Sequence, residues 1–277
     1  MGKNSSKSFK FITYLILFIG VVVSLFPFYW MVVLSSKENR EVFQTPPSFT
    51  LGNELINNIM TVFQETNFVN AFFNTLYVAT VQTVLILIFA TLAGFSFAKL
   101  KFKGKKLFFN ILMATMMIPG QLNIIPQFFL MDRLGWVGSY KALIIPGMVN
   151  AFGIFWIKQY CEEGIHDSLI ESARIDGATT FQILNKIVVP IIRPALSFLA
   201  LYSFMGAWND YMWPLIILND ESKYTLQLAL TQLQGLYTTN YPLVITGSLL
   251  SVLPIVIIFV IFSKQLIAGI SDGAIKG

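Results

Sequence analysis

The sequence contains few ionisable residues. Aspartate, glutamate, lysine and arginine make up 12% of its 277 residues, about half of their usual share in soluble domains. Cysteine and histidine each occur once, as Cys161 and His166, which excludes an intramolecular disulfide and argues against a metal site. The glycine-rich phosphate loop GxxxxGK[ST] is absent, which excludes ATP hydrolysis by that route. We therefore expect the chain to bind no metal or cofactor of its own.

Apolar residues dominate instead, at 55% of the chain, and the mean hydropathy is +0.68. Uncharged runs of about twenty residues indicate helices that cross a bilayer. The first run is too long for a cleaved signal peptide, so we interpret it as a retained span. The sequence predicts one all-α, polytopic membrane domain with six transmembrane helices, at about 11–34, 71–98, 107–131, 142–157, 191–213 and 243–263.

Basic residues are distributed unequally between the segments that connect these spans. If residues 1–10 are cytoplasmic, the cytoplasmic segments hold 14 of the 19 lysines and arginines. This bias is the positive-inside pattern of membrane proteins. It predicts that both termini, the 264–277 tail and the segment 158–190 are cytoplasmic, and it explains the net charge of +5 without nucleic acid.

Residues 158–190, called the polar segment below, interrupt the apolar sequence. The patterns Ser168-x-x-Glu171 and Thr179-x-x-Gln182 both fit a capping box, which predicts that a short helix begins at each. Gly177 lies between these helices, where a left-handed residue can end the first one. A helix–glycine–helix unit beside the membrane suits a docking platform; the alternative is that Glu171 serves only as a cap.

The polar segment resembles the EAA loop of bacterial ABC importer permeases. That loop has the pattern Glu-Ala-Ala, three residues, Gly, nine residues and Ile-x-Leu-Pro. Here Glu171-Ser172-Ala173, Gly177 and Ile187-Val188-Val189-Pro190 occupy the matching positions, with serine and valine as departures. Further stretches resemble the carbohydrate-uptake subfamily of the maltose type, namely 92–98, 117–121, 208–214 and the tail 269–277, although a disordered end would also explain the tail.

The resemblance implies a type I ABC permease fold in the cytoplasmic (inner) membrane of a prokaryote. It implies a second permease subunit, two ATPase subunits that hold ATP and Mg²⁺, an extracytoplasmic sugar-binding protein that contacts the loop 219–241, and a sugar as substrate. Glu171 would contact the ATPase and Gly177 would form the turn between the docking helices. The residues matched to ATPase coupling are Glu171, Ser172, Ala173, Asp176, Gly177, Ala178 and Pro190.

Polar and aromatic side chains in or near the spans are the candidates for a substrate pathway, because sugar hydroxyls need hydrogen-bonding groups and aromatic rings. Hydrogen bonds between helices need the same residue types. Asp210 is the acidic residue closest to a span, and its aromatic neighbours favour an anchor at the outer interface or a gate contact over a proton relay. The candidates are Asn74, Gln82, Gln121, Asn123, Asn150, Trp208, Asn209 and Asp210.

Three other functions remain as alternatives. An ion-coupled secondary carrier is disfavoured by the lone acidic candidate and by the lack of a detectable inverted repeat. A membrane enzyme is disfavoured because the single histidine lies in the polar segment. An ABC permease for a solute other than a sugar fits the same motifs.

Overall fold

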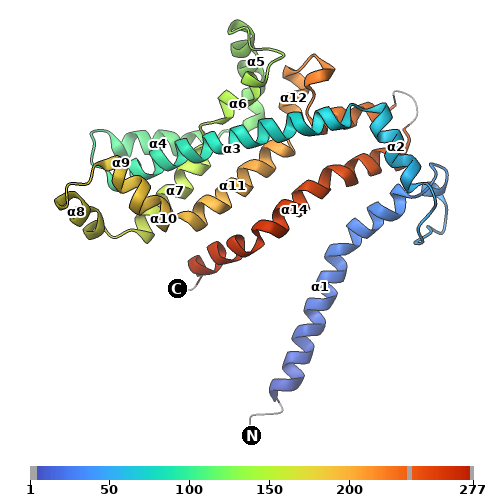
Figure 1. The fold of residues 1–277 in the computed structure, drawn as a ribbon, viewed down its shortest axis with the longest axis horizontal. Coiled ribbons are helices and arrows are strands. Elements are labelled where there is room, and N and C mark those ends of the chain that lie inside the picture. Colours follow the sequence, from blue (N-terminus) through green and yellow to red (C-terminus); the bar gives the residue numbers. More distant parts are fainter. Residues whose placement is uncertain (1–4, 236–238, 275–277) are drawn as a thin grey trace. The chain divides into compact units, whose positions relative to one another are not determined.

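The computed structural model describes residues 5–235 and 239–274, and it describes side chains from residue 9 to residue 260 outside that gap. The described residues form helices and turns and contain no strand (Figure 1). The chain divides into two compact units, residues 1–68 with 230–254 and residues 69–229 with 255–277.

The first unit contains the N-terminal part of the chain and the first part of the last helix. Its long helix α1, Ser5–Ser35, is exposed from Phe9 to Tyr29, as expected of a helix that faces lipid, and becomes buried only near its end, at Val33. The end of α1 is fastened to α2, Leu55–Glu65, because the Asn58 side-chain amide donates to the carbonyls of Ser35 at 2.9 Å and Lys37 at 3.1 Å. The unit also holds 3₁₀ turns at Glu41–Phe43 and Thr231–Leu233 and the first part of α14, Tyr241–Ala274.

The second unit contains α3, Phe68–Lys99, from its second residue on, and the helices α4 to α13 (Figure 1). Along the chain these are α4 Lys105–Thr115, α5 Ile124–Arg133, α6 Tyr140–Gly147, α7 Ala151–Gly164, α8 Asp167–Ile175, α9 Thr180–Ile183, α10 Val189–Ile191, α11 Arg193–Trp208, α12 Met212–Ile217 and α13 Leu226–Leu230. A π-helical turn, Leu184–Val188, joins α9 to α10, and 3₁₀ turns lie at Gly120–Asn123 and Glu221–Lys223.

The described residues contain four helical stretches long and apolar enough to cross a membrane: Phe9–Ser35, Phe68–Lys99, Tyr140–Gly164 and Tyr241–Val260. They contain six if each of two bent helix pairs counts as one span. The predicted all-helical, polytopic class is confirmed. The six predicted spans agree with the structure when each bent pair is taken as one span.

Both bends occur at prolines. The predicted span 107–131 turns by 93° between Thr115 and Gly120, next to Pro119. The predicted span 191–213 contains an 80° turn at Ile192, near its start and between Pro190 and Pro194, and its helix ends at Trp208. Proline lacks the N–H that continues a helix and its ring clashes with the preceding turn, which is the physical reason for both breaks.

Two other spans are longer than expected. The predicted span 142–157 lies within the 25-residue stretch Tyr140–Gly164, which consists of α6 and α7 with a short break between them. At a helical rise it is about 37 Å long, which exceeds a core of about 30 Å. Helix α14 does not end at Ser263, the last residue of the predicted span; it continues through most of the predicted tail, to Ala274. The last three tail residues, 275–277, and residues 1–4 of the predicted cytoplasmic N-terminus lie outside the described residues.

Glycines allow α3, α7 and α11 to pack closely in the second unit. A Cβ on Gly94 would lie 2.8 Å from the Cβ of Ile157, and a Cβ on Gly153 would lie 3.3 Å from the side chains of Ala90 and Leu199. Small residues let helix backbones approach, which is how helices associate in a membrane. The polar segment is attached to the end of this packed group.

Candidate functional site

Helix α8 begins one residue earlier than its predicted cap. Its N-cap is His166, which makes no side-chain capping bond, and Ser168 is already inside the helix. The predicted Ser168–Glu171 capping box is therefore wrong. In the helix, the Ser168 carbonyl accepts a hydrogen bond from the Ser172 hydroxyl at 2.9 Å, and Glu171 projects as an exposed side chain.

The turn after α8 confirms the left-handed conformation predicted for Gly177. Its φ is +80°, in the left-handed region that favours glycine. The Gly177 N–H donates to the Arg174 carbonyl at 3.0 Å, and the Ala178 N–H donates to the Ala173 carbonyl at 2.9 Å. These two bonds form a Schellman motif, which satisfies the last carbonyls of α8 and sets the direction in which the chain leaves it.

The second predicted capping box is confirmed. The Thr179 N–H donates to the Gln182 side chain at 2.8 Å, and the Gln182 N–H donates to the Thr179 hydroxyl at 3.3 Å. Helix α9 therefore begins where the sequence predicts it. It continues through the π-helical turn to Pro190 and the 80° bend.

One face of the polar segment is part of the apolar core of the second unit. Its buried members pack in the same cluster as residues of the long helices α3, α7 and α11, such as Ala90, Ile157 and Leu199. The members from the polar segment are Cys161, Ile165, Ile170, Ala173, Ile183, Leu184 and Val188. A displacement of α8 or α9 is therefore resisted by direct contact with the helices of this unit.

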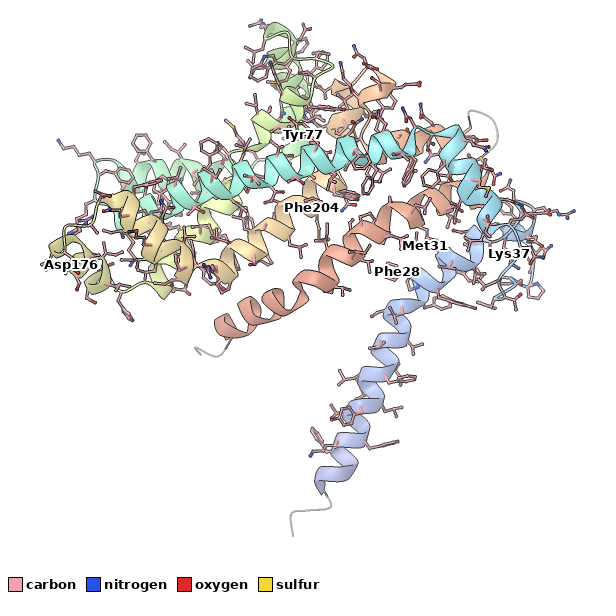
Figure 2. The ribbon with its side chains drawn as sticks, viewed as in Figure 1. Phe28, Met31, Lys37, Tyr77, Asp176 and Phe204 are labelled. Carbon is pink, nitrogen blue, oxygen red and sulfur yellow. The ribbon has the colours of Figure 1, made fainter. Side chains whose placement is uncertain are left out.

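The opposite face is exposed. Of the matched residues, Glu171, Ser172, Asp176, Gly177 and Pro190 are exposed, Ala178 is half-buried and Ala173 is buried. Figure 2 labels Asp176 at the turn that follows α8. Sequence reasoning overlooked two large apolar side chains on this face, Ile175 and Phe181, which are 86% and 69% exposed. The sequence did contain a signal for these two residues, because large apolar residues stand out within a polar stretch.

An ion pair joins α8 to the end of α3. The Lys99 ammonium donates to a carboxylate oxygen of Asp167 at 2.7 Å, and this hydrogen bond and charge lower the pKa of Asp167 below its ordinary value. A carboxylate with a lowered folded-state pKa stabilises the fold above its unfolded pKa. That contribution is present at neutral pH and is lost as the pH falls through the lowered pKa.

Several pathway candidates make structural hydrogen bonds. The Asn74 amide of α3 donates to the carbonyls of Ser222 at 2.9 Å and Tyr224 at 3.0 Å, which holds the loop before α13. Asn150 accepts from the Gly153 N–H at 2.9 Å and so caps α7. These bonds give both asparagines a packing role, whereas their role in a substrate pathway stays a prediction.

The candidates in the α11–α12 region also have local partners. Trp208 is completely buried at the end of α11, and its ring contacts those of Phe72 and Phe204, the latter labelled in Figure 2. The Asn209 amide donates to the Met205 carbonyl at 2.9 Å. Asp210 is half-buried and lies outside a helix, just before α12. Its carboxylate accepts a hydrogen bond from the Trp213 N–H at 3.4 Å.

Gln82 packs against Gly147 of α6, where an added Cβ would clash with its amide. Gln121 and Asn123 are exposed and lie in the 3₁₀ turn at the 93° bend. Neither amide is therefore buried in the core of the unit. Asn123 borders a groove on the adjoining helix.

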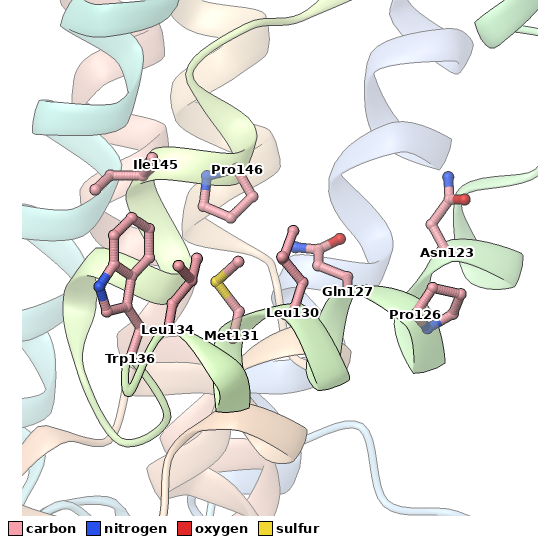
Figure 3. Close-up of a pocket in the computed structure, with 9 residues that line it drawn as sticks. All are labelled: Asn123, Pro126, Gln127, Leu130, Met131, Leu134, Trp136, Ile145 and Pro146. Atoms are coloured by element: carbon pink, nitrogen blue, oxygen red, sulfur yellow. The ribbon is translucent and has the colours of Figure 1, made fainter.

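The groove has a volume of about 510 Å³ and lies between α5, α6 and the turn that joins them (Figure 3). Asn123 and Gln127 are one helical turn apart at one end, and the indole of Trp136 lies at the other, facing Ile145. The remaining lining residues are Pro126, Leu130, Met131, Leu134 and Pro146. Gln127 and Trp136 were not singled out from the sequence, because neither belongs to a motif.

Comparison with known proteins agrees with this arrangement. The family model described as "Binding-protein-dependent transport system inner membrane component" matches residues 86–271. The chain is 31% identical over 92% of its length, and 92% of the relative, to an arabinooligosaccharides transport system permease protein of Halalkalibacterium halodurans. It is 30% identical over 92% of its length, and 94% of the relative, to an sn-glycerol-3-phosphate transport system permease protein of Salmonella typhi.

A solved structure has the same fold. It is the crystal structure of a bacterial ABC transporter involved in the import of the acidic polysaccharide alginate; one of its chains aligns with a TM-score of 0.80 and 25% identity, over 95% of this chain and 98% of that one. The family match covers more than half of the chain and includes the whole polar segment. The chain therefore belongs to the binding-protein-dependent transport system inner membrane components, the permeases of ABC importers.

Proposed function

We propose that this chain is the permease subunit of an ABC importer that moves a di- or oligosaccharide across the cytoplasmic membrane. It would assemble with a second permease, two ATPase subunits and an extracytoplasmic binding protein. The polar segment is the observation that carries the proposal: one face belongs to the core of the membrane helices, and the other presents Glu171, Ile175 and Phe181. An exposed apolar and acidic face of this kind suits a protein partner.

In this proposal ATP and Mg²⁺ bind to the partner ATPases and no cofactor binds to this chain. Closure of the ATPases would move α8 and α9. Because these helices share a core with α3, α7 and α11, the movement would pass to the pathway and switch its access from one side of the membrane to the other.

The groove beside α5 supports a neutral, hydroxyl-rich substrate. Amides such as those of Asn123 and Gln127 donate to and accept from hydroxyls, and the indole of Trp136 offers an apolar face to a sugar ring. The second candidate is a phosphate ester, because a relative transports sn-glycerol 3-phosphate. A phosphate is usually bound by arginine or lysine, and the groove lining contains neither.

Transport should require the ATPase and should prefer a sugar. We expect proteoliposomes with the complete importer and its binding protein to accumulate arabinotriose or lactose when ATP is enclosed, and glycerol 3-phosphate much less. Omission of the ATPase subunits should abolish uptake. Uptake at the full rate from an ion gradient without ATPase would identify a secondary carrier, and preferred uptake of glycerol 3-phosphate would favour the second candidate.

The proposed topology places the polar segment and the loop between α3 and α4 in the cytoplasm. In a Cys161→Ala background, a cysteine at exposed Lys103 should react with a membrane-impermeant maleimide only in inverted vesicles. A cysteine at exposed Glu221 should react in intact cells. Labelling of position 103 from outside would reject this orientation, which rests on the 14-to-5 distribution of basic residues.

A further inference from the structure

The Lys99–Asp167 ion pair joins two elements that are distant in the sequence. Lys99 is the last residue of α3, and Asp167 is the first residue of α8. The Lys99 side chain is 7% exposed, whereas that of Asp167 is 78% exposed. A lysine so deeply buried is rarely left without a partner, because an uncompensated buried charge is costly.

The position of each charge matches its helix. A cation is favoured at the C-terminal end of a helix, where Lys99 lies, and an anion is favoured in the first turn, where Asp167 lies. The end of α3 is held from a second side, since the Lys105 ammonium donates to the carbonyls of Ala98 at 3.1 Å and Leu100 at 3.2 Å. The C-terminal end of α3 is thus a firm anchor point for α8.

We propose that the Lys99–Asp167 ion pair persists during transport and makes α8 move together with the end of α3. Asp167 acts as a positioning residue, since it fixes the direction of α8 while the exposed face of the helix contacts the partner. The apolar core beneath α8 resists separation of the helices, and the ion pair adds a directional contact that an apolar surface lacks. This inference rests on the proposed function.

The test uses the complete importer in proteoliposomes. Asp167→Asn should leave the ATPase subunits co-purifying but lower transport per ATP by about fivefold or more. Transport is measured with arabinotriose, lactose or glycerol 3-phosphate, whichever the wild type moves. Asp167→Glu keeps a carboxylate at this position and should retain most of the transport that Asp167→Asn loses. A matched control is Glu38→Gln, which removes a carboxylate from the exposed 2.7 Å pair with Arg40 and should leave transport unchanged.

A zero-length carbodiimide cross-link gives a measurement that needs no sugar. It should join Lys99 to Asp167 in the resting importer and in the importer trapped with ATP and vanadate, because the proposed ion pair stays formed throughout the cycle. Loss of the cross-link in the trapped state would overturn the proposal. Normal transport per ATP in Asp167→Asn would also overturn it, as would a defect in Asp167→Glu as large as that in Asp167→Asn. A wild-type importer that hydrolyses no ATP in response to any of the three solutes would instead contradict the proposed function.

Discussion

Replacing Gly177 with valine should reduce substrate-stimulated ATP hydrolysis by about tenfold or more while the membrane helices remain inserted. A left-handed conformation costs an ordinary residue roughly 1–2 kcal/mol, and a β-branched side chain suffers more. A cost of about 1.4 kcal/mol corresponds to a tenfold change in an equilibrium. No atom of this chain lies within 4 Å of the position a Cβ would take, so within the chain the effect comes from the backbone turn, which directs α9 relative to α8.

The comparison with Gly135 isolates the position of the strain. Gly135, after α5, has a φ of +66° and also has no atom within 4 Å of a built Cβ. Gly135→Val therefore imposes similar backbone strain away from the polar segment. Because Gly135 lies between the groove residues Leu134 and Trp136, this variant should retain ATP hydrolysis when the measurement is made at saturating substrate. Gly177→Asn should behave nearly as the wild type, because asparagine tolerates the left-handed region. Normal coupling in Gly177→Val, or an equal loss in both valine variants, would contradict the role assigned to this turn.

Neutralising Glu171 should weaken the association of the ATPase subunits by roughly 2–5 kcal/mol if its carboxylate pairs with a partner cation that becomes buried. The structure sharpens this prediction. Because Glu171 is exposed in the middle of α8 and Ser168 is not the cap, a capping role is removed, and Glu171→Gln should be nearly as defective as Glu171→Ala. If Glu171 only stabilised the helix, neither variant should weaken the association, since glutamine, glutamate and alanine are all good helix formers.

The measurement is the amount of ATPase subunit that co-purifies with each Glu171 variant across a salt series. Raising the salt should narrow the difference from the wild type, because the lost interaction is electrostatic. Glu65→Gln, which removes an exposed carboxylate at the end of α2, is the matched control and should not change the association. Full association of Glu171→Gln would leave no support for a charged contact at this position.

Local patterns in the sequence were sufficient for much of the fold and of the polar segment. The membrane class follows from apolar runs, and the turn at Gly177 and the cap at Thr179 follow from residues a few positions apart. Such features involve neighbours along the chain, so their physical causes can be seen in a short stretch. The start of α8 is the exception: Ser168-x-x-Glu171 has the pattern of a cap, but the helix begins at Asp167.

The remaining features depend on contacts between distant residues. Asn74 appears from the sequence to be a free polar group in a span, yet it holds a loop about 150 positions away. Asp167 carries no motif signal, and its partner Lys99 lies 68 positions earlier. The proline positions indicate where the helices at 119 and 190 break, but the angles of 93° and 80° are measured only in the fold. By itself the sequence determined the class, the turns and the caps, because these depend on local backbone preferences. Only the tertiary structure decided which polar side chains hold helices together and which face outward, because that depends on packing between elements far apart in the chain.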